Sequence, residues 1–403
     1  MSTKPVNSQE RNTRQRIEAD LRGNILPFWM EHALDHVNGG YYGAITNDLT
    51  IDNSVPRSAV VTARILWTYS LASRVYGDPA YLEAARHAYR SLSGSFWDGE
   101  YGGVYWTVDR QGIPVNDRKH IYAQAFSIYG LSEYYRAAGD PHALELAQEL
   151  FHLVETHSYD PLHGGNIECL GRDWGNLADM RLSPKEPDAR KTMNTLLHLM
   201  EADTNLLRVW PDPLLKTRQA GLIESFLEHV IDPQTGHFRL FFDDAWHSSS
   251  PIISYGHDIE GSWLLVEAAE VQGDPALLAR ARQAAVRMAE AVFTEGLDAD
   301  GSVFSEGDRS NPRSFDKHWW GQAEGMVGFY AAYQLSGREE FARTALRCWE
   351  VIDAHFIDRS HGDWFKVLNR QSVPLPDQLK VGPWECPYHH ARACFEMLRR
   401  LPG

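Results

Sequence analysis

Apolar residues recur every three or four positions in one segment after another, which is the spacing of helices with one buried face. Ala63, Leu66 and Trp67 follow this spacing, and so does the stretch from Trp263 to Ala269. Gly-Asp-Pro or Pro-Asp-Pro connectors separate several of these segments; there Gly ends one helix, Asp caps the next and Pro suits its first turn. The pattern predicts about twelve helices, near residues 7–29, 57–76, 79–94, 119–137, 141–157, 191–209, 213–230, 255–271, 275–293, 316–335, 338–355 and 386–400.

A repeated turn orders these helices in pairs. An Asp stands four residues before a Gly in five places, and a shortened copy, Asp298 with Gly301, makes a sixth. Aromatic or β-branched residues follow each glycine, such as Tyr41 and Tyr42, and they are typical of short strands entered through a glycine turn. The repeated glycines are Gly39, Gly102, Gly164, Gly236, Gly301 and Gly362. Each of the six units therefore holds one such loop and two helices.

Six units of two helices can stack in an open solenoid or close into a ring. We favour closure, because the long loop precedes the same helix of each pair and a ring gathers all six loops at one end. The expected fold is all-α, an (α/α)6 toroid of about twelve helices with short β-hairpins in the loops at the pocket end. No linker stretch interrupts the pattern, so residues 1–403 are expected to form one catalytic domain.

Composition narrows the possible partners. The chain has 39 basic and 54 acidic residues, a net charge of −15, which disfavours nucleic acid and anionic membranes as partners. Its four cysteines lack CxxC spacing and suit a reducing compartment. No apolar run approaches a bilayer-spanning length, and the polar N-terminus lacks a signal-peptide core. We therefore expect a soluble cytoplasmic protein, and the charge leaves both monomer and homodimer open.

The starts of the six expected inner helices are rich in polar and aromatic residues. One histidine or tryptophan at such a place is usually structural, but the coincidence across six units favours a polar pocket with aromatic walls. Sugars suit this pocket, since their C–H faces stack on aromatic rings while their hydroxyls need directional partners. The residues are Arg64, His120, Tyr122, Gln124, Asn194, His198, His257, Asp258, Glu260, His318, Trp319, Trp320, Glu324, Trp384, Tyr388, His389 and His390.

Three reaction classes could use this pocket. Zinc hydrolysis is disfavoured, because HExxH is absent from the sequence and no second ligand pair stands at zinc-site spacing. Glycoside hydrolysis needs two carboxylates, for which Glu260, Glu324, Glu306 and Asp188 are candidates. The rim is richer in histidine, which suits proton abstraction next to a sugar carbonyl, leading to epimerisation or aldose–ketose isomerisation. Two or three histidines could supply these proton transfers without a metal or other cofactor, and the absence of a glycine-rich phosphate loop from the sequence argues against a nucleotide.

Six stretches of the sequence resemble one known family. They are Ala63-Arg64-Ile65-Leu66-Trp67, Lys119-His120-Ile121-Tyr122-Ala123-Gln124, Met193-Asn194-Thr195 through His198, Tyr255-Gly256-His257-Asp258-Ile259-Glu260, His318-Trp319-Trp320-Gly321-Gln322-Ala323-Glu324, and Pro387-Tyr388-His389. Together they resemble the N-acylglucosamine 2-epimerase superfamily, and within it the cellobiose-type branch, over essentially the whole chain. The resemblance implies an (α/α)6 barrel that needs no metal or nucleotide. It also implies conversion of the reducing-end glucose of β-1,4-linked disaccharides to mannose, with cellobiose and lactose as substrates and epilactose as a product.

The resemblance also implies a role for each matching residue. His389 and His257 would be the acid/base pair that removes and returns the C2 proton, and one of them would assist ring opening. His198 would stabilise the enediolate near O1 and O2. The expected substrate-binding residues are Arg64, Tyr122, Asn194 and Glu260 around the reducing-end sugar, Trp320 and Trp384 against the sugars, and Glu186 with nearby Asp188 in a loop.

The sequence departs from the family pattern in two places. Leu196 stands where the family often has a first histidine, so that only His198 remains of the pair. Glu385, Cys386 and His390 replace the usual Lys, Gly and Asn around His389, and the acidic and imidazole groups could move the pKa of that histidine. Cys386 is expected to be a buried structural thiol.

Four other functions remain possible for a chain with this fold. A sister enzyme would epimerise mannobiose or an N-acylated monosaccharide, and an isomerase of the same fold would return the proton to C1. A glycoside hydrolase is the alternative from another reaction class, and a sugar-binding toroid is the one outside enzymes.

Overall fold

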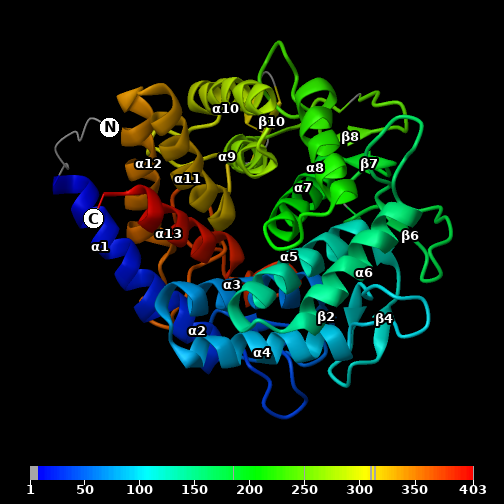
Figure 1. Ribbon diagram of the computed structural model, residues 1–403. Helices are drawn as coiled ribbons and strands as arrows, with labels where there is room; N and C mark the ends of the chain where they lie inside the picture. Colours follow the sequence, from blue (N-terminus) through cyan, green and yellow to red (C-terminus); the bar gives the residue numbers. More distant parts are fainter. Residues whose placement is uncertain (1–7, 185, 249, 309–310, 313–314, 403) are drawn as a thin grey trace.

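Six helices surround the centre of the molecule in the computed structural model, which describes residues 8–184, 186–248, 250–308, 311–312 and 315–402 (Figure 1). These inner helices are α3 (Ala59–Tyr76), α5 (Ile121–Ala138), α7 (Met193–Leu207), α9 (Tyr255–Gln272), α11 (Trp319–Ser336) and α13 (Tyr388–Arg400). Each one contacts the next along the chain, and α13 contacts α3. The ring is therefore closed, and the predicted (α/α)6 toroid is confirmed.

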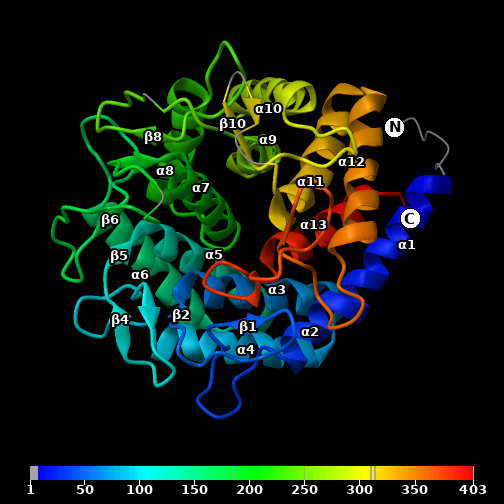
Figure 2. The same ribbon diagram turned by 180° about the vertical axis from the view of Figure 1, so that it is seen from behind.

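An outer layer of helices covers this ring (Figures 1 and 2). It consists of α4 (Pro79–Gly94), α6 (Pro141–His157), α8 (Pro213–Ser225) with η2 (Phe226–Val230), α10 (Pro275–Glu295), α12 (Glu339–Val351) with η3 (Ile352–Phe356), and the segment α1 (Ser8–Asp20), η1 (Leu21–Ile25) and α2 (Leu26–Glu31). The inner helices are buried on most sides, whereas outer helices such as α4 and α6 bury one stripe. Among the described helices, none is long and apolar enough to cross a membrane.

Short strands join each unit to the next at the ends where the inner helices begin. The strands are β1 (Ile45–Thr46), β2 (Arg57–Ser58), β3 (Thr107–Val108), β4 (Pro114–Asn116), β5 (Lys119–His120), β6 (Cys169–Leu170), β7 (Lys191–Thr192), β8 (Phe241–Phe242), β9 (Ile253–Ser254), β10 (Glu306–Asp308), β11 (Asn311–Pro312), β12 (Lys317–His318), β13 (Val367–Leu368) and β14 (Leu379–Val381). The strand before each inner helix pairs antiparallel with a strand of the following unit, and β14 pairs with β1. This layer therefore closes the ring a second time.

These strands also correct the predicted helix boundaries. Residues 57–58, 119–120, 191–192 and 317–318 were expected inside helices but form β2, β5, β7 and β12. Their hydrogen bonds go to the neighbouring unit, a distant partner that the local apolar spacing does not reveal. The other predicted bounds agree with the structure to within about two residues.

An ion pair with a buried Lys or Arg side chain ties five of the six repeated turns to the strand before an inner helix. In the second unit, Nζ of Lys119 in β5 donates to Asp98 at 2.9 Å, and both side chains are fully buried. The equivalent pairs are Arg57 with Asp35, Lys191 with Asp160, Lys317 with Asp300, and Lys380 with Asp358. The fourth unit has Ile253 at this position, and its Asp232 pairs with Arg239 instead. In four units the repeated Asp thus positions the start of an inner helix, and in the fifth Asp300, two residues after Asp298, makes the equivalent contact.

Candidate active site

The predicted site residues come together at the N-terminal ends of the inner helices. Eight belong to the inner helices themselves, Trp384 lies four residues before the start of α13, and Glu186 lies in the loop before β7. The eight are Arg64 on α3, Tyr122 on α5, Asn194 and His198 on α7, His257 and Glu260 on α9, Trp320 on α11, and His389 on α13. The ring closure therefore brings side chains from all six units to one place.

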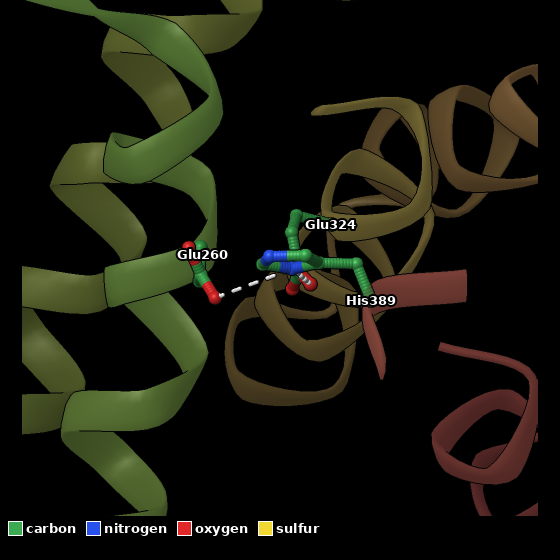
Figure 3. Close-up of side chains that lie close together, drawn as sticks. All are labelled: Glu260, Glu324 and His389. Atoms are coloured by element: carbon green, nitrogen blue, oxygen red, sulfur yellow. Dashed lines mark hydrogen bonds and ion pairs between the residues drawn. The ribbon is translucent and has the colours of Figure 1, made fainter. Parts of the chain in front are cut away.

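Two buried carboxylates, those of Glu260 and Glu324, lie beside the ring of His389 (Figure 3). Its Nδ1 lies 2.8 Å from Oε1 of Glu324 and 3.7 Å from Oε1 of Glu260. Arg392 and the indole N–H of Trp263 both donate to the Glu324 carboxylate, so this group acts as an acceptor and His389 donates from Nδ1. Nε2 is then the ring nitrogen left for a substrate.

Burial controls the protonation of this group. Desolvation, together with the positive charges of Arg64 and Arg392, lowers the pKa of His389 well below its usual value. Desolvation and the neighbouring Glu324 raise the pKa of Glu260 to about 8. Burial raises the pKa of Glu324 as well, but both of its oxygens accept hydrogen bonds, whereas Oε2 of Glu260 has no partner among the described residues, so a proton at neutral pH is held on Glu260.

His198 is positioned in the same manner on α7. Its Nδ1 lies 3.0 Å from Oε2 of Glu201, and its ring packs against Phe126 at 4.6 Å between centroids. Although burial opposes ionisation, Arg392 and His198 lower the pKa of Glu201 to about 2. A carboxylate only accepts hydrogen bonds, so Nδ1 of His198 carries the proton and Nε2 is again free for a ligand. Desolvation lowers the pKa of His198 to about 4, and the ring is neutral near pH 7.

His257 lies at the start of α9 beside a cavity. Its Nδ1 is 2.7 Å from Oγ of Ser254, and its ring lies 4.6 Å from that of Trp320, which is 5.7 Å from the His389 ring. Desolvation lowers the pKa of His257 to about 3, so it is a neutral imidazole. The cavity has a volume of about 300 Å³, and its lining includes His257, Asn194, Glu186 and Glu306.

Arg64 and several aromatic residues form a second group of contacts at this end of the ring. Nη2 of Arg64 donates to the Tyr122 hydroxyl at 2.8 Å, and the guanidinium lies over the ring of Phe126. Trp384 is half-buried and meets Tyr122 edge to face at 6.0 Å and Trp106 at 5.9 Å. These residues join an aromatic surface to a fixed positive charge, which suits a polar ligand with apolar faces.

The two acidic residues of the 183–188 loop have different surroundings. Glu186 lines the cavity, and desolvation together with Glu306 raises its pKa to about 7. Asp188 accepts a hydrogen bond from the backbone N–H of Met180 at 3.0 Å and lines a neighbouring depression. Of the two, Glu186 is the one that faces the cavity beside His257.

The departures near His389 are also accounted for. Nε2 of His390 lies 2.7 Å from Asp363, so this ring is held on the far side of α13. Cys386 is fully buried and burial raises the pKa of its thiol, which fits a structural residue. The charges that lower the pKa of His389 come instead from Arg64, Arg392, His198 and His257.

Arg392, Glu201 and Ser254 are not among the site residues that the sequence predicts. A signal was present, because each of the three site histidines is followed three positions later by a charged residue: His198 by Glu201, His257 by Glu260 and His389 by Arg392. Residues three apart lie on one face of a helix. The spacing therefore indicates a layer of charges directly beneath the histidines.

One group of side chains has the composition of a metal site. Ligand atoms of Glu260, Glu324 and His389 lie within 4.8 Å of one another. Arg392 donates to both carboxylates, so its guanidinium already supplies the positive charge that a metal ion would bring. A cation binding there would have to displace that contact.

Comparisons with known proteins agree over nearly the whole chain. The family model described as N-acylglucosamine 2-epimerase (GlcNAc 2-epimerase) matches residues 40–393. A cellobiose 2-epimerase of Bacteroides fragilis is 45% identical over 386 residues, which are 96% of this chain and 98% of that protein. The structure of cellobiose 2-epimerase from Bacillus thermoamylovorans has a TM-score of 0.91 at 39% identity, covering 97% of this chain and 100% of its own. A D-mannose isomerase structure, with a TM-score of 0.82 at 21% identity over 99% of this chain and 100% of its own, is similar in fold.

Proposed function

The chain belongs to the N-acylglucosamine 2-epimerase family, and we propose that this carbohydrate epimerase inverts C2 of the reducing-end glucose in β-1,4-linked disaccharides without a cofactor. Cellobiose would give glucosyl-mannose, and lactose would give epilactose. The relatives named cellobiose 2-epimerase support this substrate class. The aromatic wall around Trp384 supports it too, because it offers a surface for a second sugar ring.

The observation that carries the proposal is the shared orientation of three histidines. His198, His257 and His389 each have Nδ1 engaged by a neighbouring side chain, which leaves Nε2 for a substrate. Their lowered pKa values keep them neutral near pH 7, so each can accept a proton. Three neutral bases at the N-terminal ends of the inner helices suit proton transfer to and from carbon.

The reaction follows from this arrangement. In the open-chain sugar, Nε2 of His257 or His389 removes the C2 proton, and the electron pair moves towards the C1 carbonyl to form an enediolate. The other histidine, which has first bound a proton from solvent at Nε2, delivers it to the opposite face of C2, and the carbonyl re-forms with C2 inverted. His198 acts on the enediolate near O1 and O2 through Nε2, which carries no proton and accepts a hydrogen bond from the hydroxyl at C2. The enzyme regains its starting state when the two histidines exchange protons with solvent.

Other side chains orient the sugar. Among the described residues, Oε2 of Glu260 and Oδ1 of Asn194 are buried without a hydrogen-bond partner, as expected of groups that await sugar hydroxyls. Arg64 and Tyr122 supply further polar contacts. Glycoside hydrolysis fits less well, because Glu260 and Glu324 both bind Arg392 instead of flanking a bond.

An NMR assay in deuterated buffer tests the proposal directly. EDTA-treated protein is incubated with cellobiose, and we expect a manno-configured reducing end with deuterium at C2. A ketose labelled at C1 would identify an isomerase, free glucose would identify a hydrolase, and either result would overturn the proposal. If cellobiose and lactose both stay unchanged, the disaccharide assignment is wrong, and mannobiose and N-acetylglucosamine are the next substrates.

Replacement of His389 tests the catalytic assignment. His389→Ala should lower the epimerisation rate by at least about 1,000-fold, since it removes one of two proton-transfer groups. His142→Ala, on the exposed outer face of α6, serves as the matched control and should retain the wild-type rate. Wild-type turnover by His389→Ala would show that the proton is moved by another group.

A further inference from the structure

Arg392 lies directly beneath the histidines, one helical turn after His389 on α13. Its side chain is only 2% exposed. Its guanidinium lies 4.9 Å from the centre of the Trp263 ring and 4.4 Å from that of Tyr388. A buried charge of this kind needs compensation from the groups around it.

Carboxylates from three other helices supply this compensation. Nη1 donates to Glu201 of α7 and to the Tyr388 hydroxyl, while Nη2 donates to Glu260 of α9 and, at 2.8 Å, to Glu324 of α11. All three carboxylates are at most 4% exposed. One planar guanidinium thus joins three inner helices to α13, a geometry that the single ammonium of lysine cannot reproduce.

Two of these carboxylates hold histidines of the proposed site. Glu201 uses its other oxygen, Oε2, to accept from Nδ1 of His198, and Glu324 uses the same Oε1 to accept from both Arg392 and Nδ1 of His389. We propose that Arg392 is a positioning residue that keeps His198 and His389 together in the Nδ1–H tautomer, through Glu201 and Glu324. This inference rests on the proposed epimerase function.

Arg392 can control these tautomers because its positive charge balances the negative charges of Glu201, Glu260 and Glu324. Without the guanidinium, three buried carboxylates would repel one another and would take up protons. A protonated Glu201 or Glu324 can donate to Nδ1, which moves the imidazole proton to Nε2 and removes the lone pair that accepts a proton from the sugar. The titratable and charged groups around Arg392 and the two histidines are Arg64, Tyr129, His198, Glu201, His257, Glu260, Glu324, Tyr388 and His389.

Kinetics of Arg392→Lys give the first test. We expect kcat for cellobiose epimerisation to fall about 10- to 100-fold while KM changes less than about threefold, because Arg392 supports the histidines without being assigned to the sugar. The acid limb of the pH profile should move to higher pH, because the carboxylates are more easily protonated. A kcat within twofold of wild type, with an unshifted profile, would overturn the inference.

Arg57→Lys is the matched control. Arg57 is also buried and paired with a carboxylate, Asp35, but it belongs to the repeated turn, and four other units have lysine at its position. This variant should keep kcat per folded molecule and the wild-type pH profile. If it shifts the profile as Arg392→Lys does, the effect is a general response to altered buried charge, and the inference fails.

The tautomers can be measured even if Arg392→Lys fails to fold. In wild-type protein with 15N-labelled histidine, the ring-nitrogen shifts of His198 and His389 should show a proton on Nδ1 in both, and Arg392→Lys should show a mixture. A proton on Nε2 of either ring in the wild type would contradict the inference. This readout requires no turnover, so it separates failure of the positioning role from failure of the epimerase assignment.

Discussion

At the scale of single residues, the indole of Trp320 on α11 packs tightly against Gly256 in the first turn of α9. A methyl group at Gly256 would lie 2.5 Å from Cη2 of the Trp320 indole, closer than real contacts allow. The absence of a side chain at Gly256 therefore lets the indole lie between His257 and His389. The position of the two proposed proton-transfer groups depends on this contact.

Gly256→Ala should lower kcat/KM for cellobiose by more than about tenfold, because the added methyl group displaces the indole and a small misplacement is costly in catalysis. Gly221→Ala is the matched control. It also lies in a helix, but nothing is within 4 Å of the added carbon, and alanine should stabilise α8 by about 0.5 to 1 kcal/mol. Steady-state kinetics and thermal melts check both. Unchanged kinetics in Gly256→Ala would show that Trp320 is free to move.

The buried groups also predict the pH dependence of kcat/KM. His257 must be neutral to accept a proton. Burial lowers its pKa to about 3, so activity should persist well below pH 6.5 and be lost only as the pH approaches that value of about 3. Burial raises the pKa of Glu260 to about 8, so its proton is present below that pH and lost above it. We expect an acid limb near pH 3, set by His257, and an alkaline limb near pH 8, set by Glu260.

Two checks apply to this profile. Circular dichroism at each pH separates titration of the site from unfolding. Glu260→Gln keeps a hydrogen-bond donor but cannot titrate, so its alkaline limb should move to higher pH. An acid limb centred near pH 6.5 would mean that the site histidines are solvated rather than buried.

At the scale of the elements, the strand before each inner helix determines where that helix begins. In β14, Nζ of Lys380 donates at 2.6 Å to Asp358 and at 2.6 Å to the carbonyl of Gly362, and the lysine side chain is fully buried. The same strand pairs with β1 and leads into α13, which carries His389. One ion pair therefore links the sixth turn, the strand layer and the helix that carries His389.

Lys380→Met should lower the free energy of unfolding by about 3 to 5 kcal/mol, because Asp358 stays buried without its partner. Lys216→Met, at an exposed position on α8, should change it by less than about 0.5 kcal/mol. Urea unfolding of the two variants measures both values. A loss below about 1 kcal/mol in Lys380→Met would show that Asp358 is satisfied by the turn backbone alone.

At the scale of the whole molecule, closure distinguishes this chain from an open stack of helical repeats. The contact of α13 with α3 and the pairing of β14 with β1 join the last unit to the first. Terminal repeats of an open array can be lost with only a partial loss of stability. In the ring, each inner helix has two neighbours, and removing one exposes the sides of both.

A chain that ends at Pro387, and so lacks α13, should lose the cooperative unfolding transition of the full-length protein. The sides of α11 and α3 that pack against α13 in the full-length protein would become exposed to water, and their apolar surface would no longer be buried. A chain that ends at Leu401 keeps α13 and is the control. Urea unfolding followed by circular dichroism compares their transitions. A sharp transition with a full-length slope in the shorter chain would show that the units are stable independently.

The sequence by itself determined the number of units, the helix positions to within about two residues, and the residue types at the helix starts. These features depend on local spacing and on a turn repeated six times, which a linear sequence displays directly. The extent of a single domain and the catalytic roles stay predictions. Only the tertiary structure decided which nitrogen of His389 contacts Glu324 and how Arg392 joins the site. These contacts link residues 65, 132 and 191 positions apart, and the geometry of such distant contacts is set only when the ring closes.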